Sequence, residues 1–264
     1  SGSPDASGLF CVMLPINYIR FSSILQWQIN RWLAGRGIIN LSRTLLGFIQ
    51  YGKIQEKENS GGNLMKILLT GFEPFNKELI NPSCEAVRRL PDRIGGAEIA
   101  KAEIPVSFTR SGPVLKEAIT ACRPDIVLCI GQAGGYAGIA IERIAVNLQD
   151  ASIPDNDGVQ PHDQPVSADG PAAYFSSLPV KEIVAGLQAD GIPAFLSNSA
   201  GTYVCNHLMY TLLHLIHHES RPMQGGFIHV PYSMEQAAAK TPVPPSMELS
   251  QITRALERVV RILI

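Results

Sequence analysis

Asp125-Ile-Val-Leu-Cys-Ile130, running into Gly131-Gln-Ala-Gly-Gly135, is the stretch of this sequence that decides the fold. A continuous apolar run without polar alternation is typical of a strand that is covered on both faces. The glycines that follow break the run and indicate a turn. Strands covered on both faces belong mostly to parallel sheets with helices on each side, so this stretch predicts a core strand of an α/β domain.

Strand and helix patterns alternate on both sides of this run. Apolar runs predict strands at 66–70, 98–106, 139–148, 193–197 and 226–230. Helical periodicity, with prolines near the starts or just beyond the ends, predicts helices at 82–90, 111–122, 180–189, after Cys205, and at 249–264. This alternation predicts an α/β fold: a three-layer α/β/α sandwich with a mixed, largely parallel central sheet in a single domain. Active sites of such folds lie beyond the carboxyl ends of the strands, where loops 71–75, 131–135 and 230–232 are expected to gather.

The bulk composition is that of an ordinary globular protein. The chain has 264 residues, 45 % of them hydrophobic and 17 % charged, which is enough for one sizeable domain. A net charge of −1 provides no electrostatic basis for binding nucleic acid or an anionic membrane, so neither is expected as a partner.

Residues 1–64 differ from the rest of the chain. They begin with linker-like Ser-Gly-Ser-Pro, contain a patchy apolar region at 9–49, and end in a polar, turn-rich segment at 53–63. Pro15 and Arg20 break the apolar region, which argues against a transmembrane helix, and an amphipathic surface helix at 24–46 is the remaining membrane alternative. We therefore expect an N-terminal extension over 1–64 that is non-native, disordered or artefactual, followed by the functional domain at 65–264. Met65 offers an internal start directly before the first core strand.

The five cysteines, at positions 11, 84, 122, 129 and 205, form an odd set without Cys-x-x-Cys spacing. This pattern argues against a disulfide framework and against a cysteine-based zinc site, and it favours a reducing cytoplasm. His214 and His218 form an i,i+4 pair, but no further ligand is well placed to complete a metal site, so none is expected.

One cysteine stands in a distinctive context. Ser199-Ala-Gly-Thr-Tyr-Val-Cys205 is a small-residue turn that places Cys205 in the first turn of an apolar helix, where unpaired N–H groups and the helix dipole favour a reactive thiolate. Gly225-Gly-Phe-Ile-His229 predicts a buried strand that ends on a histidine. Glu142 interrupts another apolar strand, where a carboxylate is costly unless it is paired. A Cys, a His and a Glu on separate elements suggest nucleophilic catalysis, with Asp155 as an alternative acid.

Eight motifs, in order along the chain, resemble those of pyroglutamyl-peptidase I, the C15 cysteine peptidases. They are Met65-Lys-Ile-Leu-Leu-Thr-Gly-Phe-Glu-Pro-Phe75, Asn81-Pro-Ser83, Gly131-Gln-Ala-Gly-Gly135, Glu142-Arg-Ile-Ala-Val-Asn147, Ile153-Pro-Asp-Asn156, Gly170-Pro-Ala-Ala-Tyr174, Ser199-Ala-Gly-Thr-Tyr-Val-Cys-Asn-His207 and Gly225-Gly-Phe-Ile-His-Val-Pro-Tyr232. The resemblance covers essentially all of 65–264 and none of 1–64.

The resemblance implies a cytoplasmic cysteine exopeptidase that removes N-terminal pyroglutamate from peptides through a thioester, without metal or cofactor. It implies Cys205 as nucleophile, His229 as general base and Glu142 as the group that orients His229. It also implies a homo-oligomer, a tetramer in related proteins. The substrate pocket that it implies has apolar walls and a few polar groups: Phe72, Phe75, Asn81, Ile153, Tyr203 and Val204, with Gln132 as a candidate polar wall.

The sequence departs from the family pattern at three places. Tyr136 and Ser152 stand where relatives carry arginine, and 76–79 replaces a Gly-Gly turn. Two alternatives to an active peptidase stay open, the first because of Tyr136 and Ser152 and the second because of the glycine-rich loop. One is a pseudo-peptidase that binds blocked N-termini. The other is a phosphate-dependent, nucleoside-phosphorylase-like enzyme that uses the 131–135 loop, although this loop lacks the lysine and the spacing of known phosphate-binding motifs.

Overall fold

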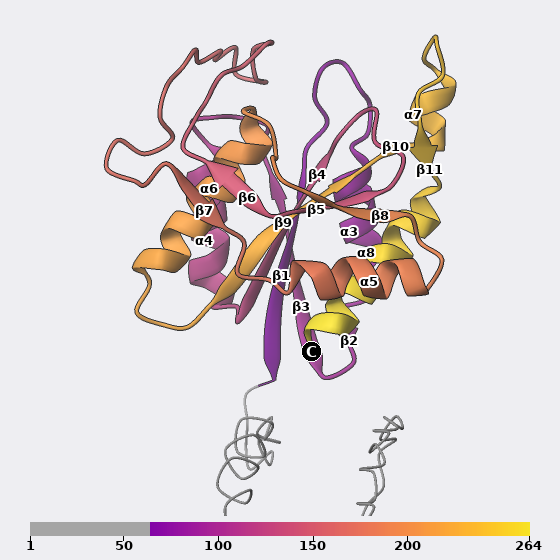
Figure 1. Ribbon diagram of the computed structural model, residues 1–264, viewed down its shortest axis with the longest axis horizontal. Helices are drawn as coiled ribbons and strands as arrows, with labels where there is room; N and C mark the ends of the chain where they lie inside the picture. Colours follow the sequence, from indigo (N-terminus) through magenta and orange to yellow (C-terminus); the bar gives the residue numbers. More distant parts are fainter. Residues whose placement is uncertain (1–63) are drawn as a thin grey trace, which may run out of the picture. The chain divides into compact units, whose positions relative to one another are not determined.

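A seven-stranded sheet forms the centre of the computed structural model, which describes residues 64–264 (Figure 1). The strand order is β2-β3-β1-β4-β9-β5-β8. β1, β3, β4 and β9 are parallel, β5 is antiparallel to β9, β8 is parallel to β5, and β2 is antiparallel to β3. The strands are β1 (Met65–Phe72), β2 (Arg93–Ile94), β3 (Ala97–Ile104), β4 (Ile126–Gln132), β5 (Ile139–Glu142), β8 (Ala194–Ser197) and β9 (Gln224–Val230). The prediction of a mixed, largely parallel sheet is confirmed.

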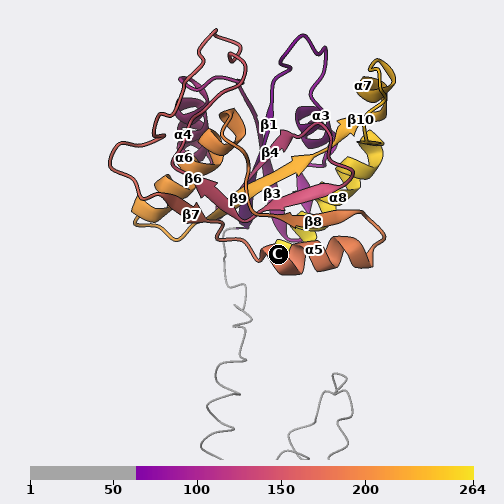
Figure 2. The ribbon, with the colours of Figure 1, turned by 45° about the horizontal axis from the view of Figure 1, so that its top comes forward.

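Helices cover both faces of the sheet (Figures 1 and 2). The helices α3 (Pro82–Arg89), α5 (Val180–Ala189) and α8 (Leu249–Leu263) pack on one face, and α4 (Ser111–Cys122) and α6 (Val204–His218) pack on the other. Smaller elements complete the described chain: β6 (Ile144–Val146), β7 (Ala173–Phe175), β10 (Tyr232–Ser233), α7 (Met234–Ala238) and β11 (Ser246–Met247). The three layers match the predicted sandwich.

Side-chain alternation explains why the core strands are apolar throughout. In β1, Ile67 and Leu69 belong to the core under α3 and α8, while Leu68 and Phe72 belong to the core under α6. Every residue of β4 is buried, as the continuous apolar run at 125–130 predicts.

The expected strand at 139–148 is wrong as a single element. It divides at Arg143 into β5, which stays in the central sheet, and β6, which pairs with β7 in a separate ribbon. The amide of Arg143 donates to the carbonyl of Ser197 (2.8 Å), and its carbonyl accepts from Ser176 (2.9 Å). Apolar residues continue across the division, so the sequence pattern does not reveal it. The expected strand at 98–106 ends at Ile104, because Pro105 has no N–H for the ladder.

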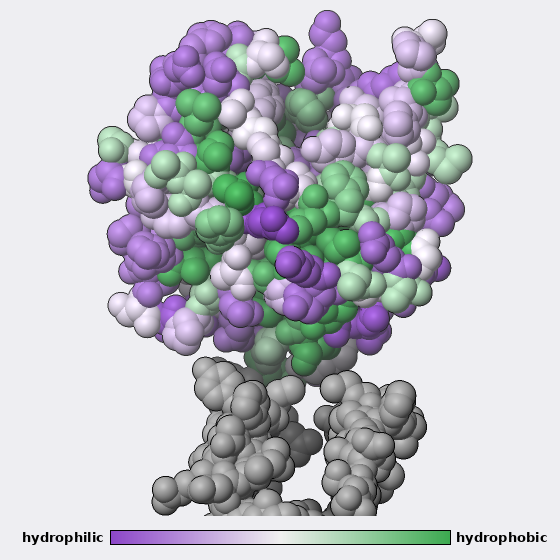
Figure 3. Space-filling view, in the orientation of Figure 1, coloured by the Kyte–Doolittle hydropathy of each residue, from purple (hydrophilic) through white to green (hydrophobic). Residues whose placement is uncertain are grey.

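The extension at 1–64, with Cys11 and the possible surface helix at 24–46, lies outside the described residues except for Leu64. None of the helices within 64–264 is long and apolar enough to cross a membrane. In the space-filling view, polar and apolar side chains are interspersed over the visible face of this unit (Figure 3).

Candidate active site

The turn before α6 presents Cys205 at the start of the helix. Gly201 has a φ of 78°, a left-handed conformation that glycine adopts without strain, and its amide donates to the Ser199 hydroxyl (3.2 Å). Thr202 ties the turn to the neighbouring loop through a hydrogen bond from its hydroxyl to the Asp150 carbonyl (2.7 Å). Helix α6 begins at Val204 and has no side-chain N-cap. Cys205 therefore lies in the first turn, as expected, beside N–H groups without intrahelical partners.

The antiparallel pairing of β5 with β9 brings Glu142 to His229. His229 faces Ala140 across the ladder, which makes Glu142, two residues along, its diagonal neighbour on the same sheet face. A long side chain spans this separation, and His229 Nδ1 lies 2.8 Å from Glu142 Oε1. Both side chains are buried. The pairing with Glu142 uses Nδ1 and leaves the other ring nitrogen of His229 available, and Cys205 lines the same cavity as His229.

The His229 imidazole is held in an environment that favours its protonated form. Burial lowers the pKa of His229, but the nearby Cys205 sulfur and the Glu142 carboxylate outweigh this and raise the pKa to about 9. An imidazole with this pKa is a competent acceptor for a thiol proton at neutral pH. It then remains charged, ready to protonate a leaving amine.

Gly131 makes room for the Cys205 sulfur. It lies opposite His229 in the β4–β9 register. A Cβ at Gly131 would lie 2.7 Å from Phe227 Cζ and 3.0 Å from Cys205 Sγ. The space that a side chain would fill is the space into which the sulfur projects. The glycine in this motif therefore has a packing role at the site.

A cavity of about 250 Å³ opens at Cys205 and His229. Besides Cys205 and His229, it is lined by six of the seven expected pocket residues and by six others. The expected ones are Phe72, Phe75, Asn81, Gln132, Tyr203 and Val204, and the additional ones are Val106, Ala133, Gly134, Tyr136, Ala200 and Gly201. Among the described residues that line the cavity there is no Asp, Glu, Lys or Arg.

Ile153, the seventh expected pocket residue, does not line this cavity. Its side chain is partly exposed, at 39 %. The loop that contains Ile153 contacts the cavity wall instead, because the hydroxyl of Tyr203, a lining residue, donates to the Pro154 carbonyl (3.0 Å). Asp155, the alternative acid, accepts from the amides of Phe108 (2.8 Å) and Val159 (2.8 Å), so it braces this loop while Glu142 pairs with His229.

Asn81 organises the first loop. As the N-cap of α3, its side-chain oxygen accepts from the Ser83 amide (3.1 Å), and its side-chain nitrogen donates to the Glu73 carbonyl (3.0 Å). The Ser83 hydroxyl in turn accepts from the Phe72 amide (3.0 Å). These bonds hold Phe72 and Phe75 at the cavity.

Two further residues lie close to Cys205 or His229. Asn206 was not singled out from the sequence, and Tyr136 was noted there only as a departure from the family pattern. Asn206 is fully buried and hydrogen bonds to Val146 of β6 and to Leu148 beyond the end of that strand. Its signal in the sequence is only a polar residue inside an apolar helix. Tyr136 lies edge-on to the His229 ring, with centroids 6.2 Å apart, and also packs edge-on against Phe195 of β8, with centroids 5.2 Å apart. It therefore shields the imidazole where relatives were expected to carry arginine.

The other described cysteines differ from Cys205. Burial raises the pKa of both Cys84 and Cys129 to about 12 and also raises that of Cys122. All four described cysteines are free thiols. His214 and His218 lie with ring centroids 4.5 Å apart, and within 64–264 no group of three metal-ligating side chains gathers.

The profile of a family described as Pyroglutamyl peptidase, Peptidase C15, matches residues 65–264. A pyrrolidone-carboxylate peptidase from Thermosipho africanus is 56 % identical over 192 residues, which span 73 % of this chain and 93 % of that protein. The enzyme of the same name from Streptococcus pyogenes is 52 % identical over 193 residues, or 73 % of this chain and 89 % of that protein.

Solved structures show the same likeness. Pyroglutamyl peptidase I from Bacillus amyloliquefaciens superimposes with a TM-score of 0.73 at 47 % identity, covering 76 % of this chain and 95 % of that one. A mutant pyrrolidone carboxyl peptidase from Pyrococcus furiosus gives a TM-score of 0.73 at 44 % identity, covering 75 % and 97 %.

Proposed function

The chain belongs to the pyroglutamyl peptidase family C15, and we propose that Cys205, His229 and Glu142 catalyse the removal of N-terminal pyroglutamate from peptides. The chain is a cysteine exopeptidase of this family. The observation that supports the assignment of residues most directly is the buried 2.8 Å contact between Glu142 and His229 beside the helix-terminal Cys205.

The chemistry follows from the placement of the three groups. His229 takes the proton of Cys205, and the sulfur attacks the pyroglutamyl carbonyl carbon. As the tetrahedral intermediate collapses, the C–N bond breaks and His229 returns the proton to the leaving amine. Water, deprotonated by His229, then hydrolyses the thioester, releasing pyroglutamate and restoring the thiol. Glu142 keeps the imidazole oriented and stabilises its charge.

The start of α6 supplies the groups that would stabilise the developing oxyanion. The amide of His207 is the first to donate within the helix, to the Tyr203 carbonyl (3.1 Å), so the Cys205 amide has no intrahelical partner. The N-terminal end of the helix dipole adds a favourable field. Among the amides of loop 131–135, that of Ala133 is not available, because it donates to Val230 (2.9 Å).

The lining of the cavity suits an uncharged lactam. Aromatic and aliphatic walls suit an uncharged five-membered ring, and the side-chain amides of Asn81 and Gln132 add two polar groups to the lining. A free α-ammonium group would lose its hydration here without meeting a carboxylate, since none lines the cavity. The pocket should therefore select peptides whose N-terminus is cyclised.

Several wider assignments belong to the same proposal. Activity resides in 65–264, because the family profile matches these residues and related proteins are covered over most of their length. The extension at 1–64 is then dispensable for catalysis. A homotetramer is proposed from family resemblance, and a reducing cytoplasm from the four free thiols.

Hydrolysis of pyroglutamyl-aminomethylcoumarin by three proteins tests the proposal: the full chain, the chain starting at Met65, and Cys205→Ala. We expect activity in the first two and none in the third. Cys122→Ala, which removes another thiol that is not fully buried, is the matched control and should stay active. A full chain that binds a pyroglutamyl peptide without cleaving it would instead indicate a pseudo-peptidase, and turnover that requires phosphate would indicate a phosphorylase.

A further inference from the structure

We propose that Gln236 is a positioning residue that fixes the side-chain amide of Gln132 with its NH₂ group toward the substrate cavity. This inference rests on the proposed function and adds to it the origin of lactam recognition. Gln236 belongs to α7, does not line the cavity, and is separated from Gln132 by 104 residues.

The hydrogen-bond network determines which way both amides point. The side-chain oxygen of Gln236 accepts from the backbone N–H of Ser233 (3.2 Å), a group that can only donate. The nitrogen of Gln236 must therefore be the atom that points to Gln132. It also faces the carbonyl of Ile80 (3.2 Å) and the carboxylate of Glu78 (3.3 Å), both of which can only accept.

The orientation of Gln132 follows from that of Gln236. The nitrogen of Gln236 lies 3.0 Å from the oxygen of Gln132, so that oxygen is occupied as an acceptor. Among the described residues, the Gln132 side chain makes this one hydrogen bond. Gln132 lines the cavity, so the group left to meet a ligand is its NH₂ donor.

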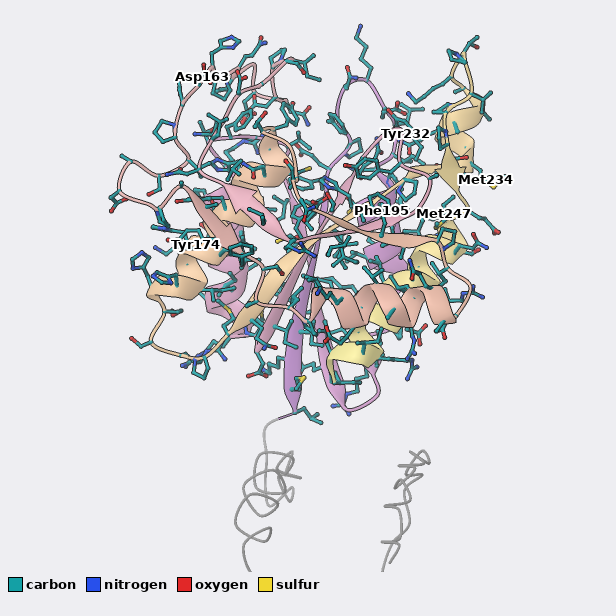
Figure 4. The ribbon with its side chains drawn as sticks, in the orientation of Figure 1. Asp163, Tyr174, Phe195, Tyr232, Met234 and Met247 are labelled. Carbon is teal, nitrogen blue, oxygen red and sulfur yellow. The ribbon has the colours of Figure 1, made fainter. Side chains whose placement is uncertain are left out.

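Gln236 is itself held rigidly. It is buried, and with Ser233 it forms a capping box at the start of α7. Lys240 follows α7 in the chain. It forms an ion pair with Glu78, and its Nζ lies 4.9 Å from the centre of the Tyr232 ring. Figure 4 shows Tyr232 and Met234 at the α7 end of the molecule. Contacts from the loop around Glu78 and from the start of α7 thus fix the position of the Gln236 side chain.

A fixed donor has a consequence for specificity. A freely rotating glutamine offers either a donor or an acceptor, whereas Gln132 in this network offers a donor to the cavity. The ligand group that matches it is a carbonyl oxygen, such as that of the lactam ring. A saturated ring without a carbonyl, as in an N-terminal proline, would leave the donor unpaired in a largely apolar cavity.

The test uses the full chain with Gln236→Glu, which keeps the acceptor for Ser233 but replaces the NH₂ group by a second carboxylate oxygen. Gln132 must then turn its own NH₂ group toward residue 236 and its oxygen toward the ligand. We expect KM for pyroglutamyl-aminomethylcoumarin to rise about 10-fold, with kcat changed by less than about 3-fold. The inhibition constant of 2-pyrrolidone, the bare lactam, should rise by a similar factor.

Two further variants and a control complete the design. Gln236→Glu places a second carboxylate next to Glu78, which can impair folding. The double variant Glu78→Gln, Gln236→Glu removes this repulsion and should show the same increase in KM. Gln251→Glu, exposed on α8, makes the same change of charge and should match the wild type. In a Gln132→Ala background, Gln236→Glu should raise KM no further, because Gln236 acts through Gln132.

An unchanged KM in both Gln236 variants, or an additional KM increase in the Gln132→Ala background, would overturn the positioning role. In either case an active wild type leaves the peptidase assignment intact. An inactive wild type would instead overturn the proposed function itself.

Discussion

At the scale of single residues, we expect the charge on His229 to determine how activity depends on pH. Its pKa of about 9 means that the imidazolium is present at neutral pH and is lost as the pH rises through that value. In the proposed mechanism, loss of this proton removes the general acid that releases the amine, so kcat/KM should fall on the alkaline side near pH 9.

The first prediction concerns Glu142→Gln. Glu142 is one of the groups that raise the pKa of His229, so replacing its charge should move the alkaline limb of kcat/KM to lower pH. The maximum of kcat/KM should also fall by about 10²-fold, since the imidazole loses its orienting carboxylate. A pH–rate profile checks both effects. An alkaline limb that stays in place would show that Glu142 does not act on His229.

Gly131→Ala should disable the enzyme without unfolding it. The added Cβ would meet Phe227 and the Cys205 sulfur, and displacing the sulfur by a fraction of an ångström to one ångström should lower kcat/KM by about 10²-fold. Gly96→Ala is the matched control, since a Cβ there meets nothing within 4 Å. Steady-state kinetics of both variants test this, and full activity in Gly131→Ala would contradict the packing role.

At the scale of elements, Asn206 joins helix α6 to strand β6. Its side-chain oxygen accepts from the Val146 amide (3.0 Å), and its nitrogen donates to the carbonyls of Val146 (2.9 Å) and Leu148 (3.0 Å). Strand β6 pairs with β7 outside the central sheet, so these bonds link that two-stranded ribbon to helix α6, which carries Cys205. The same link fixes the residue next to Cys205.

Asn206→Leu should therefore lower the free energy of unfolding by about 3 kcal/mol, because three bonds are lost and backbone groups are left unpaired. His217→Leu, exposed on the same helix, should change it by less than about 0.5 kcal/mol. Urea unfolding measures both. Equal effects of the two substitutions would mean that Asn206 is not a structural link.

The turn at 76–77 is a second feature at this scale. Asn76 and Lys77 have φ values of 51° and 64°, so two successive non-glycine residues adopt left-handed conformations where the family resemblance implied a Gly-Gly turn. The backbone conformation is thus the one that glycine favours. Replacing the Gly-Gly turn by Asn76 and Lys77 therefore raises the conformational energy of the turn more than it changes the course of the backbone.

Lys77→Gly should stabilise the protein by about 1 kcal/mol, the relief of left-handed strain less the greater chain entropy of glycine. Lys77→Ala gives no such relief and should be neutral or slightly destabilising. Thermal unfolding of the two variants separates these outcomes. A gain in Lys77→Ala equal to that in Lys77→Gly would exclude a backbone origin.

At the scale of the whole molecule, the described cysteines should differ strongly in reactivity. Cys205 lines the open cavity, whereas burial raises the pKa of Cys84 and Cys129 to about 12. Brief treatment with iodoacetamide near neutral pH should label Cys205 before Cys84, Cys122 and Cys129 and abolish activity in parallel. Peptide mapping identifies the labelled site, and inactivation without label on Cys205 would contradict this ordering.

Much of this molecule follows from its sequence, for physical reasons. Continuous apolar runs and proline positions predict the layers, because burial on both faces demands such runs. The three residues that we propose as catalytic stand out because a helix-start cysteine, a strand-end histidine and a strand glutamate are each unusual in apolar surroundings. The division of 139–148 at Arg143 was missed, since it depends on hydrogen bonds to Ser197 and Ser176 from distant elements.

The parts of the site that the sequence does not reveal are those made by tertiary contact. The Gln236–Gln132 bond joins residues 104 positions apart, and neither local composition nor periodicity indicates it. The exclusion of Ile153 from the cavity is a similar case, because the path of its loop is set by Asp155 and by the Tyr203 hydroxyl.

The central claim is that a thioester forms on Cys205. Rapid-quench mass spectrometry of the full chain during turnover of pyroglutamyl-aminomethylcoumarin tests it most directly. We predict a pyroglutamyl group on the Cys205 peptide, which appears with the first release of coumarin and decays as substrate is exhausted. Steady hydrolysis with that peptide unmodified, or with the acyl group on another residue, would contradict the account.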